Sequence, residues 1–132
     1  MHYMKLNNES FLKIQNGKKT IELRLKDKKR SLIKVGNLIE FTNLLDNNKL
    51  ICKVIKLHSF LNFNELYKYL PLDKCGYTKE EILKANPNDM LNFYSKEKQD
   101  QYGVLGIELI VIGNKKMAFA TLGCVLCSLL FI

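Results

Sequence analysis

Polar and apolar residues alternate strictly along residues 20–25, and this two-residue period is typical of an extended strand that buries one face. Ile21, Leu23 and Leu25 are predicted to point to one side of the strand. Glu22 and Arg24 then share the opposite side, where neighbouring side chains of one strand lie about 7 Å apart. The sequence therefore predicts a strand that offers two opposite charges to a common ligand.

Other segments of the chain carry strand-like or helix-like patterns. Further strands are expected at residues 1–6, 38–45, 50–57 and 104–112, with a turn at 46–49 that joins the middle two into a hairpin. Helices are expected at residues 9–16, 64–70, 79–85 and 96–101, where Asn7 or Asn8, Thr78 and Ser95 supply caps. Strands thus surround a helical insertion without regular alternation, which predicts an α+β fold with a curled sheet or a small barrel.

The charge of the chain is unevenly distributed. The 132 residues are 47% hydrophobic and carry a net charge of +8, which suits one globular domain with a basic surface. The first 60 residues hold thirteen Lys and Arg against five Asp and Glu. Such a focused positive field favours a polyanionic partner, with nucleic acid ahead of anionic lipid. The alternative is a lysine-rich background composition, since Lys outnumbers Arg nineteen to two.

Histidine and cysteine usage gives no metal-site pattern. The chain has two histidines, and its only C-x-x-C pair, Cys124 and Cys127, lies in an apolar segment without the context of a redox or zinc site. No metal or cofactor is therefore expected. Residues 1–12 are mixed polar and show no secretory signal, so we expect a cytoplasmic protein with free thiols.

The C-terminal segment differs in composition from the rest of the chain. After the polar residues 113–116, residues 117–132 carry no charge, so we divide the chain into a domain at 1–112 and an apolar tail at 113–132. A sixteen-residue helix spans about 24 Å, less than the ~30 Å hydrocarbon core of a bilayer. Lys115 and Lys116 would flank a membrane anchor. The alternatives are a docking element or an artefact of the gene model.

The spacing Gly17-x-Lys19-x-x-Glu22-x-Arg24 brings together the side chains best suited to bind a charged ligand or to take part in catalysis. Arg24 offers a planar fork for a phosphate or a base edge, Lys19 offers a compact point charge, and Glu22 accepts hydrogen bonds that orient both. If this face lines a cavity, the group forms a clamp for an anion. On a solvated face, the same charges would form a weak ion pair worth at most about 1 kcal/mol.

Several blocks of the sequence resemble the ASCH domain family. GKKTIELR at residues 17–24 is followed by KVGNLIEF at 34–41, and KCGY at 74–77 precedes YGVLGIE at 102–108. The resemblance covers roughly residues 1–112, and Gly17, Lys19, Glu22 and Arg24 match the family's GxKxxExR motif. It implies a PUA-like small β-barrel with short helices, and a role in RNA binding linked to RNA metabolism or translation-linked regulation.

From the motif, the charge and the resemblance, we predict that a basic cleft binds RNA or a nucleotide-like ligand. Tyr94 and Ser95 also match a family block, and an aromatic ring there could stack on a base. The predicted nucleic-acid contacts are Lys18, Lys19, Glu22, Arg24, Lys28, Arg30, Tyr94 and Ser95.

Two enzymatic alternatives stay open, with Lys19, Glu22 and Arg24 as the catalytic residues in both. The superfamily includes small amidohydrolases that deacetylate N4-acetylcytidine, and Lys19 matches their lysine. Glu22, however, replaces their threonine nucleophile, and a carboxylate cannot do the hydroxyl's part, although Thr20 on the same face could be a displaced nucleophile. In a ribonuclease, Lys19 and Arg24 would stabilise the phosphorane while Glu22 took the 2′-hydroxyl proton.

Overall fold

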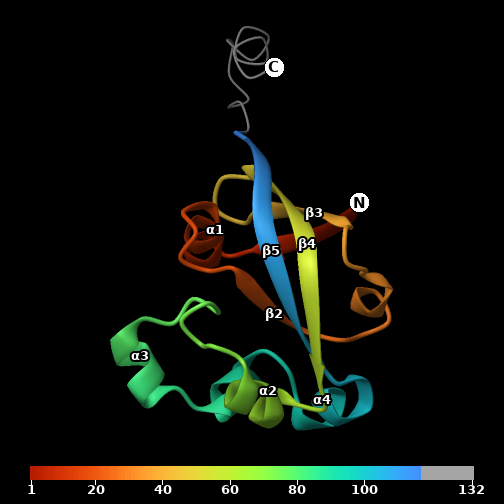
Figure 1. Cartoon of the computed structure of the whole chain (residues 1–132), viewed down its shortest axis with the longest axis vertical. Helices are drawn as coiled ribbons and strands as arrows, with labels where there is room; N and C mark the ends of the chain where they lie inside the picture. The colour runs from red at the N-terminus through yellow and green to blue at the C-terminus, as the bar shows by residue number, and fades with distance from the viewer. Residues whose placement is uncertain (117–132) are drawn as a thin grey trace, which may run out of the picture.

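The computed structural model of the chain describes residues 1–116, which form a five-stranded sheet with helices at its inner side and at one end (Figure 1). The strands are β1 (His2–Leu6), β2 (Ile21–Leu25), β3 (Leu38–Asn43), β4 (Lys49–Phe60) and β5 (Val104–Lys115). The helices are α1 (Asn8–Gln15), α2 (Phe63–Tyr69), α3 (Lys79–Lys84) and α4 (Lys96–Tyr102), with short 3-10 turns η1 (Arg30–Leu32) and η2 (Pro87–Asn92). The predicted α+β class is confirmed.

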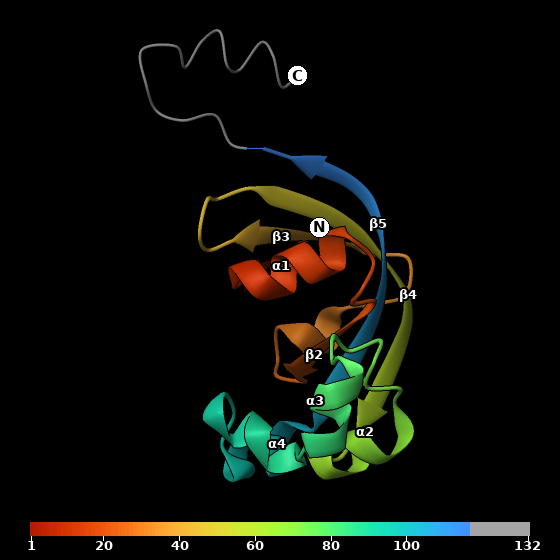
Figure 2. The same ribbon diagram turned by 90° about the vertical axis from the view of Figure 1, so that its left-hand side faces the viewer.

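Strands β4 and β5 are the longest strands of the sheet. Each is twelve residues long, and they pair antiparallel along almost their full length. The order across the sheet is β1-β3-β4-β5-β2, and only the β1–β3 pair is parallel. Register shifts in the β4–β5 ladder fall between Ile51 and Cys52 and between Val54 and Lys56, and such irregularities bend a strand. Figure 2 shows the resulting curve, with α1 on its inner side.

The predicted small β-barrel is wrong, because the sheet is curved but remains open (Figure 2). β1 pairs only with β3 and β2 pairs only with β5, so these two strands are the edges of the sheet. Each edge strand is only five residues long. The edges are instead bridged by a side chain, since Nη2 of Arg24 in β2 donates a hydrogen bond to the backbone carbonyl of Lys5 in β1, at 2.8 Å. Alternation, turn signals and apolar density predicted the strands but carried no information on whether the two edges would meet.

Short polar side chains define where the helices begin. The side chains of Asn7, Asn62, Thr78 and Ser95 accept hydrogen bonds from backbone N–H groups in the first turns of α1, α2, α3 and α4. These caps satisfy donors that a helix cannot pair internally. Two of the starts, at Thr78 and Ser95, are as predicted. The predicted cap of α1 was Asn7 or Asn8, and the structure shows Asn7 in that role.

Two apolar clusters pack on the sheet and leave the candidate site between them. The first lies between α1 and the concave face, where Phe11 and Ile14 of the helix pack with Phe41 and Val54. The second joins the helical insertion, residues 61–103 between β4 and β5, to the end of the sheet and is built around buried residues such as Ile21, Phe63 and Leu66. The loop before α3 also holds the start of β2, since the carbonyl of Lys74 accepts hydrogen bonds from the N–H groups of Thr20 and Ile21, at 2.8 and 3.0 Å.

The last described strand is longer than predicted, since β5 continues to Lys115 rather than stopping at Ile112. The uncharged residues 117–132 lie outside the described part of the chain, and so does the predicted role of the tail. Within residues 1–116, no helix combines the length and apolar character that a membrane crossing requires.

Candidate functional site

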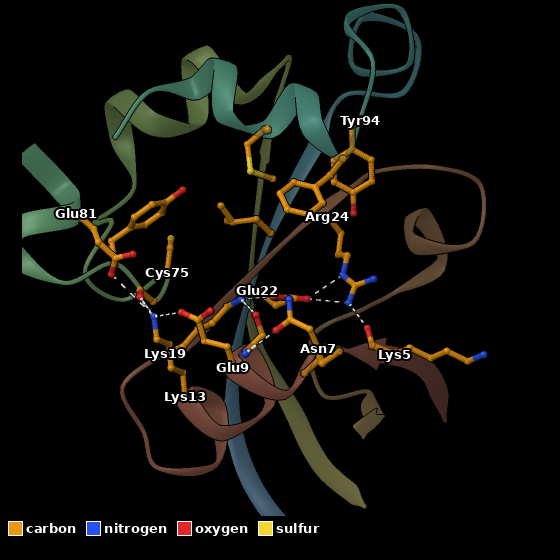
Figure 3. A pocket seen from close by; sticks show the side chains of 17 residues that line it. Lys5, Asn7, Glu9, Lys13, Lys19, Glu22, Arg24, Cys75, Glu81 and Tyr94 are labelled. Carbon is orange, nitrogen blue, oxygen red and sulfur yellow. Dashed lines mark hydrogen bonds and ion pairs between the residues drawn. The ribbon is translucent and has the colours of Figure 1, made fainter. Parts of the chain in front are cut away.

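A cavity of about 400 Å³ opens between α1, the ends of β1 and β2, and the helical insertion (Figure 3). Three residues of the predicted motif, Lys19, Glu22 and Arg24, are among the residues that line it. Helix α1 contributes Ser10 and Lys13, and the insertion contributes aromatic and apolar side chains. Segments far apart in the sequence therefore meet around the charged face of β2.

Glu22 lies in this charged face and is only 4% exposed. One carboxylate oxygen, Oε1, is 2.6 Å from Nζ of Lys19. The other, Oε2, accepts a hydrogen bond from Nε of Arg24 at 2.8 Å and lies 2.8 Å from Nη2 of the same guanidinium. Both carboxylate oxygens are thus engaged by cations, and each cation is held in a defined position.

Burial of Glu22 acts to raise the pKa of its carboxyl group. The charges of Lys19 and Arg24, together with their hydrogen bonds to the carboxylate, outweigh that effect and hold the pKa below its ordinary value. Glu22 is therefore ionised at neutral pH. With both cations charged, the Lys19–Glu22–Arg24 cluster carries one net positive charge at the cavity.

Gly76 fixes the aliphatic part of the Lys19 side chain. It has a φ of +100°, in the region that favours glycine, and a Cβ there would lie 3.1 Å from Cδ of Lys19. The carbonyl of Gly76 accepts a hydrogen bond from Nζ of Lys13 at 2.8 Å. The same lysine pairs with Glu9 at 3.1 Å, so α1 and the loop before α3 are joined over the cavity.

Aromatic residues and a buried thiol complete the wall formed by the insertion. Tyr94 stacks on Phe63 with ring centroids 5.8 Å apart, and Tyr77 hydrogen bonds through its hydroxyl to Tyr67. Burial raises the pKa of the Cys75 thiol to about 12. The thiol is therefore protonated at neutral pH and is not an activated nucleophile.

Residues 4–113 of the chain match the ASCH domain. The chain belongs to the ASCH domain family. No curated protein matches it. The match over residues 4–113 confirms the predicted resemblance to this family.

Solved structures agree with this assignment. The crystal structure of hypothetical protein PH0355 shares 31% identity, with a TM-score of 0.69 over 85% of this chain and 100% of that one. The solution NMR structure of protein PF0455 from Pyrococcus furiosus shares 30% identity, with a TM-score of 0.61 over 84% of this chain and 96% of that one. At 15% identity, the ASCH domain from Lactobacillus crispatus has the same fold, with a TM-score of 0.59 over 83% of this chain and 79% of that one.

The structure of this ASCH domain brings together only part of the predicted contact set. Tyr94 lines the cavity with the motif cluster, and its labelled side chain lies on the same side as Arg24 in Figure 3. The other predicted contacts, which do not line it, are Lys18, Lys28, Arg30 and Ser95. Arg30 pairs with Asp27 at 2.7 Å, and Ser95 caps α4. Their role as contacts stays a prediction for the surface outside the cavity.

The predicted contact set leaves out several residues that line the cavity, among them Lys13, Phe93 and Glu81. The Glu9–Lys13 spacing on a predicted helix was a visible i,i+4 signal, but it indicates a helix-surface pair rather than a site. Gly76 lay in a block that resembles the family, which was the one signal for its position. Among residues 1–116, no three His, Cys, Asp or Glu side chains are grouped so that they could hold a metal ion.

Replacing Glu22 with Gln should destabilise the domain strongly. Gln keeps the shape of the side chain but leaves Lys19 and Arg24 as neighbouring, largely buried cations without a counter-charge. Breaking a buried pair in this way costs about 3–5 kcal/mol. Urea denaturation at pH 7 should show this loss in the free energy of unfolding.

The matched control is Glu65→Gln, because Glu65 pairs with Lys68 at a solvent-exposed position where an ion pair is worth about 1 kcal/mol or less. The folded-state pKa of Glu22 is lowered, so its stabilisation is present above the unfolded pKa and is lost as the pH falls through the folded pKa. The stability difference between wild type and Glu22→Gln should therefore narrow on acidification. Equal stability of the two proteins at pH 7 would contradict this account.

Proposed function

We propose that this domain binds RNA, or a ligand containing a nucleotide, in the cavity lined by Lys19, Glu22 and Arg24, and that it acts in RNA metabolism or translation-linked regulation. The observation that carries the proposal is the buried carboxylate that holds two cations side by side at the cavity. Glu22 fixes the positions of the two cations, while its single charge leaves one positive charge in excess. A preorganised cationic pair of this kind suits a phosphate group.

Donor groups remain on both cations for a ligand. The contacts of Arg24 described above use Nε and Nη2, and a guanidinium carries further N–H donors on Nη1. The contacts of Lys19 are with Glu22 at 2.6 Å and with the hydroxyl of Ser10 at 3.5 Å, and an ammonium has three donors. A phosphate in the cavity would therefore find hydrogen-bond donors that the protein has already oriented.

The surroundings of the cavity favour a polyanion over a small isolated anion. Lys5 lines the cavity from β1, and Lys29 donates a hydrogen bond to the carbonyl of Tyr3 in the same edge strand, at 3.1 Å. Lys28 in the loop after β2 is exposed. These residues belong to the basic N-terminal half, whose field would attract a nucleic-acid strand toward the cavity.

The test is the affinity of single-stranded RNA for Arg24→Gln compared with Lys53→Gln. Both changes remove one positive charge, but Lys53 is exposed in β4 and does not line the cavity. Loss of charge-assisted hydrogen bonds at Arg24 should weaken binding about tenfold or more. Lys53→Gln should have a much smaller effect. Fluorescence anisotropy at fixed salt measures both, with circular dichroism to show that each variant is folded.

Equal losses in the two variants would reduce the interaction to nonspecific attraction and would overturn the cavity as the binding site. Salt gives a second readout, because log affinity for single strands falls with log salt with a slope of about −0.7 per phosphate contacted. The slope should be shallower for Arg24→Gln than for wild type, since one phosphate contact is lost.

A hydrolase remains the second candidate, because Lys19 places an ammonium beside the Ser10 hydroxyl in the same cavity. The state of Glu22 disfavours it, however. A general base works best with a pKa near the working pH, whereas Glu22 has a lowered pKa and two engaged oxygens. Thr20, the alternative nucleophile, does not line the cavity.

We therefore expect no turnover of N4-acetylcytidine or of short RNAs. Mass spectrometry of each substrate after incubation with the protein measures this directly. Product formation that disappears in a folded Lys19→Ala variant would establish the enzymatic alternative instead. Product that persists in that variant would point to a contaminating activity.

A further inference from the structure

The charges that line the cavity nearly cancel, although the whole chain is strongly basic. The basic side chains are Lys5, Lys13, Lys19 and Arg24, and the acidic ones are Glu9, Glu22 and Glu81. Glu9 and Glu81 lie 3.1 and 4.0 Å from the ammonium of Lys13, so they neutralise that side of the cavity. One positive charge is left over, which matches the single negative charge of a phosphodiester and would disfavour a triphosphate.

Phe93 belongs to the same cavity lining as this charge cluster and is largely exposed to solvent. It lines the cavity and yet is 72% exposed, whereas its neighbour Tyr94 is stacked on Phe63. Among the described residues, Phe93 has no ring partner. Aromatic rings of this kind are the usual stacking surfaces for bases of single-stranded nucleic acids.

The backbone holds Phe93 in place even though its side chain is exposed. The carbonyl of Met90 accepts hydrogen bonds from the N–H groups of both Phe93 and Tyr94, at 3.0 and 2.9 Å. Met90 itself is buried in the second apolar cluster. The ring therefore projects from a fixed point at the end of η2, and binding would not require this segment to become ordered.

The size of the cavity limits how much of a strand can enter. Small-molecule sites span about 300–1,000 Å³, and a cavity of about 400 Å³ is near the lower end of that range. This space suits one nucleotide rather than two. The remainder of a strand would lie outside, over the basic surface near β1 and the loop after β2.

We infer that the cavity accepts one nucleotide of a single-stranded RNA, with its base stacked on Phe93 and its phosphodiester group at Arg24 and Lys19. The inference rests on the proposed function and adds to it the size of the bound unit, its charge and the residue that contacts the base. The exposed ring could also serve a protein partner, and the experiment below separates the two.

The experiment compares Phe93→Leu, Phe93→Tyr and Tyr69→Leu. Leu keeps an apolar side chain without an aromatic face, and Tyr restores that face. Tyr69 is the matched control, because it is an aromatic residue with a similar exposure of 69% that does not line the cavity. The probes are a five-nucleotide oligoadenylate, adenosine, AMP and ATP, measured by isothermal titration calorimetry, and thermal unfolding shows whether each variant is folded.

Phe93→Leu should weaken the binding of the oligoadenylate and of AMP by about tenfold, within the range that base–aromatic stacking supports. The Phe93→Tyr and Tyr69→Leu variants should bind both ligands with affinities within about twofold of the wild-type values. ATP should bind no more tightly than AMP, and adenosine should bind more weakly than AMP.

Unchanged binding in Phe93→Leu, with weakened binding in Arg24→Gln, would overturn the stacking role and leave the proposed function standing. ATP that binds tenfold more tightly than AMP would overturn the single-phosphate assignment. No binding of any probe or of longer RNA by wild type would overturn the proposed function and this inference together, and would leave Phe93 as a surface for a protein partner.

Discussion

A carboxylate that is removed from water needs nearby charges or hydrogen bonds to offset its lost hydration. In this ASCH domain, the geometry of the site follows from how that loss is offset for Glu22. Desolvation alone would favour its neutral form, but Lys19 at 2.6 Å and Arg24 at 2.8 Å favour the ionised one. The compensation works in both directions, because the carboxylate also holds two cations that would otherwise repel each other. The result is a pair of positioned donors with one net positive charge at the cavity.

The open sheet explains why this cluster can face a ligand. In a closed barrel, β1 and β2 would pair through their backbones, whereas here the bridge between them is a hydrogen bond from Arg24 to the Lys5 carbonyl. The helical insertion closes the remaining side, since Gly76 packs on the stem of Lys19. The cavity is therefore bounded by the two sheet edges, α1 and the insertion, and the motif residues lie where these parts meet.

The sequence carried enough information to predict the strands and the motif face but not the walls around it. Alternation along residues 20–25 placed Glu22 and Arg24 on one face, because side-chain direction in a strand is a local property. Phe93 is distant in the sequence, and its place beside that face depends on the packing of Met90 and Phe63, which no local pattern encodes. The barrel was wrongly predicted for a related reason, since edge pairing is decided by tertiary structure. Lys18 was selected by its charge, which says nothing of where its side chain points.

Glu22 is ionised inside the domain because Lys19 and Arg24 stabilise its charged form. The most direct measurement is a carbon-13 NMR titration of the Glu22 side-chain carboxyl, assigned by comparison with Glu22→Gln. We predict a midpoint below the ordinary value of 4.5 in wild type and a higher midpoint in Arg24→Gln. A wild-type midpoint above 4.5 would show that burial prevails over the two cations, and would contradict the account.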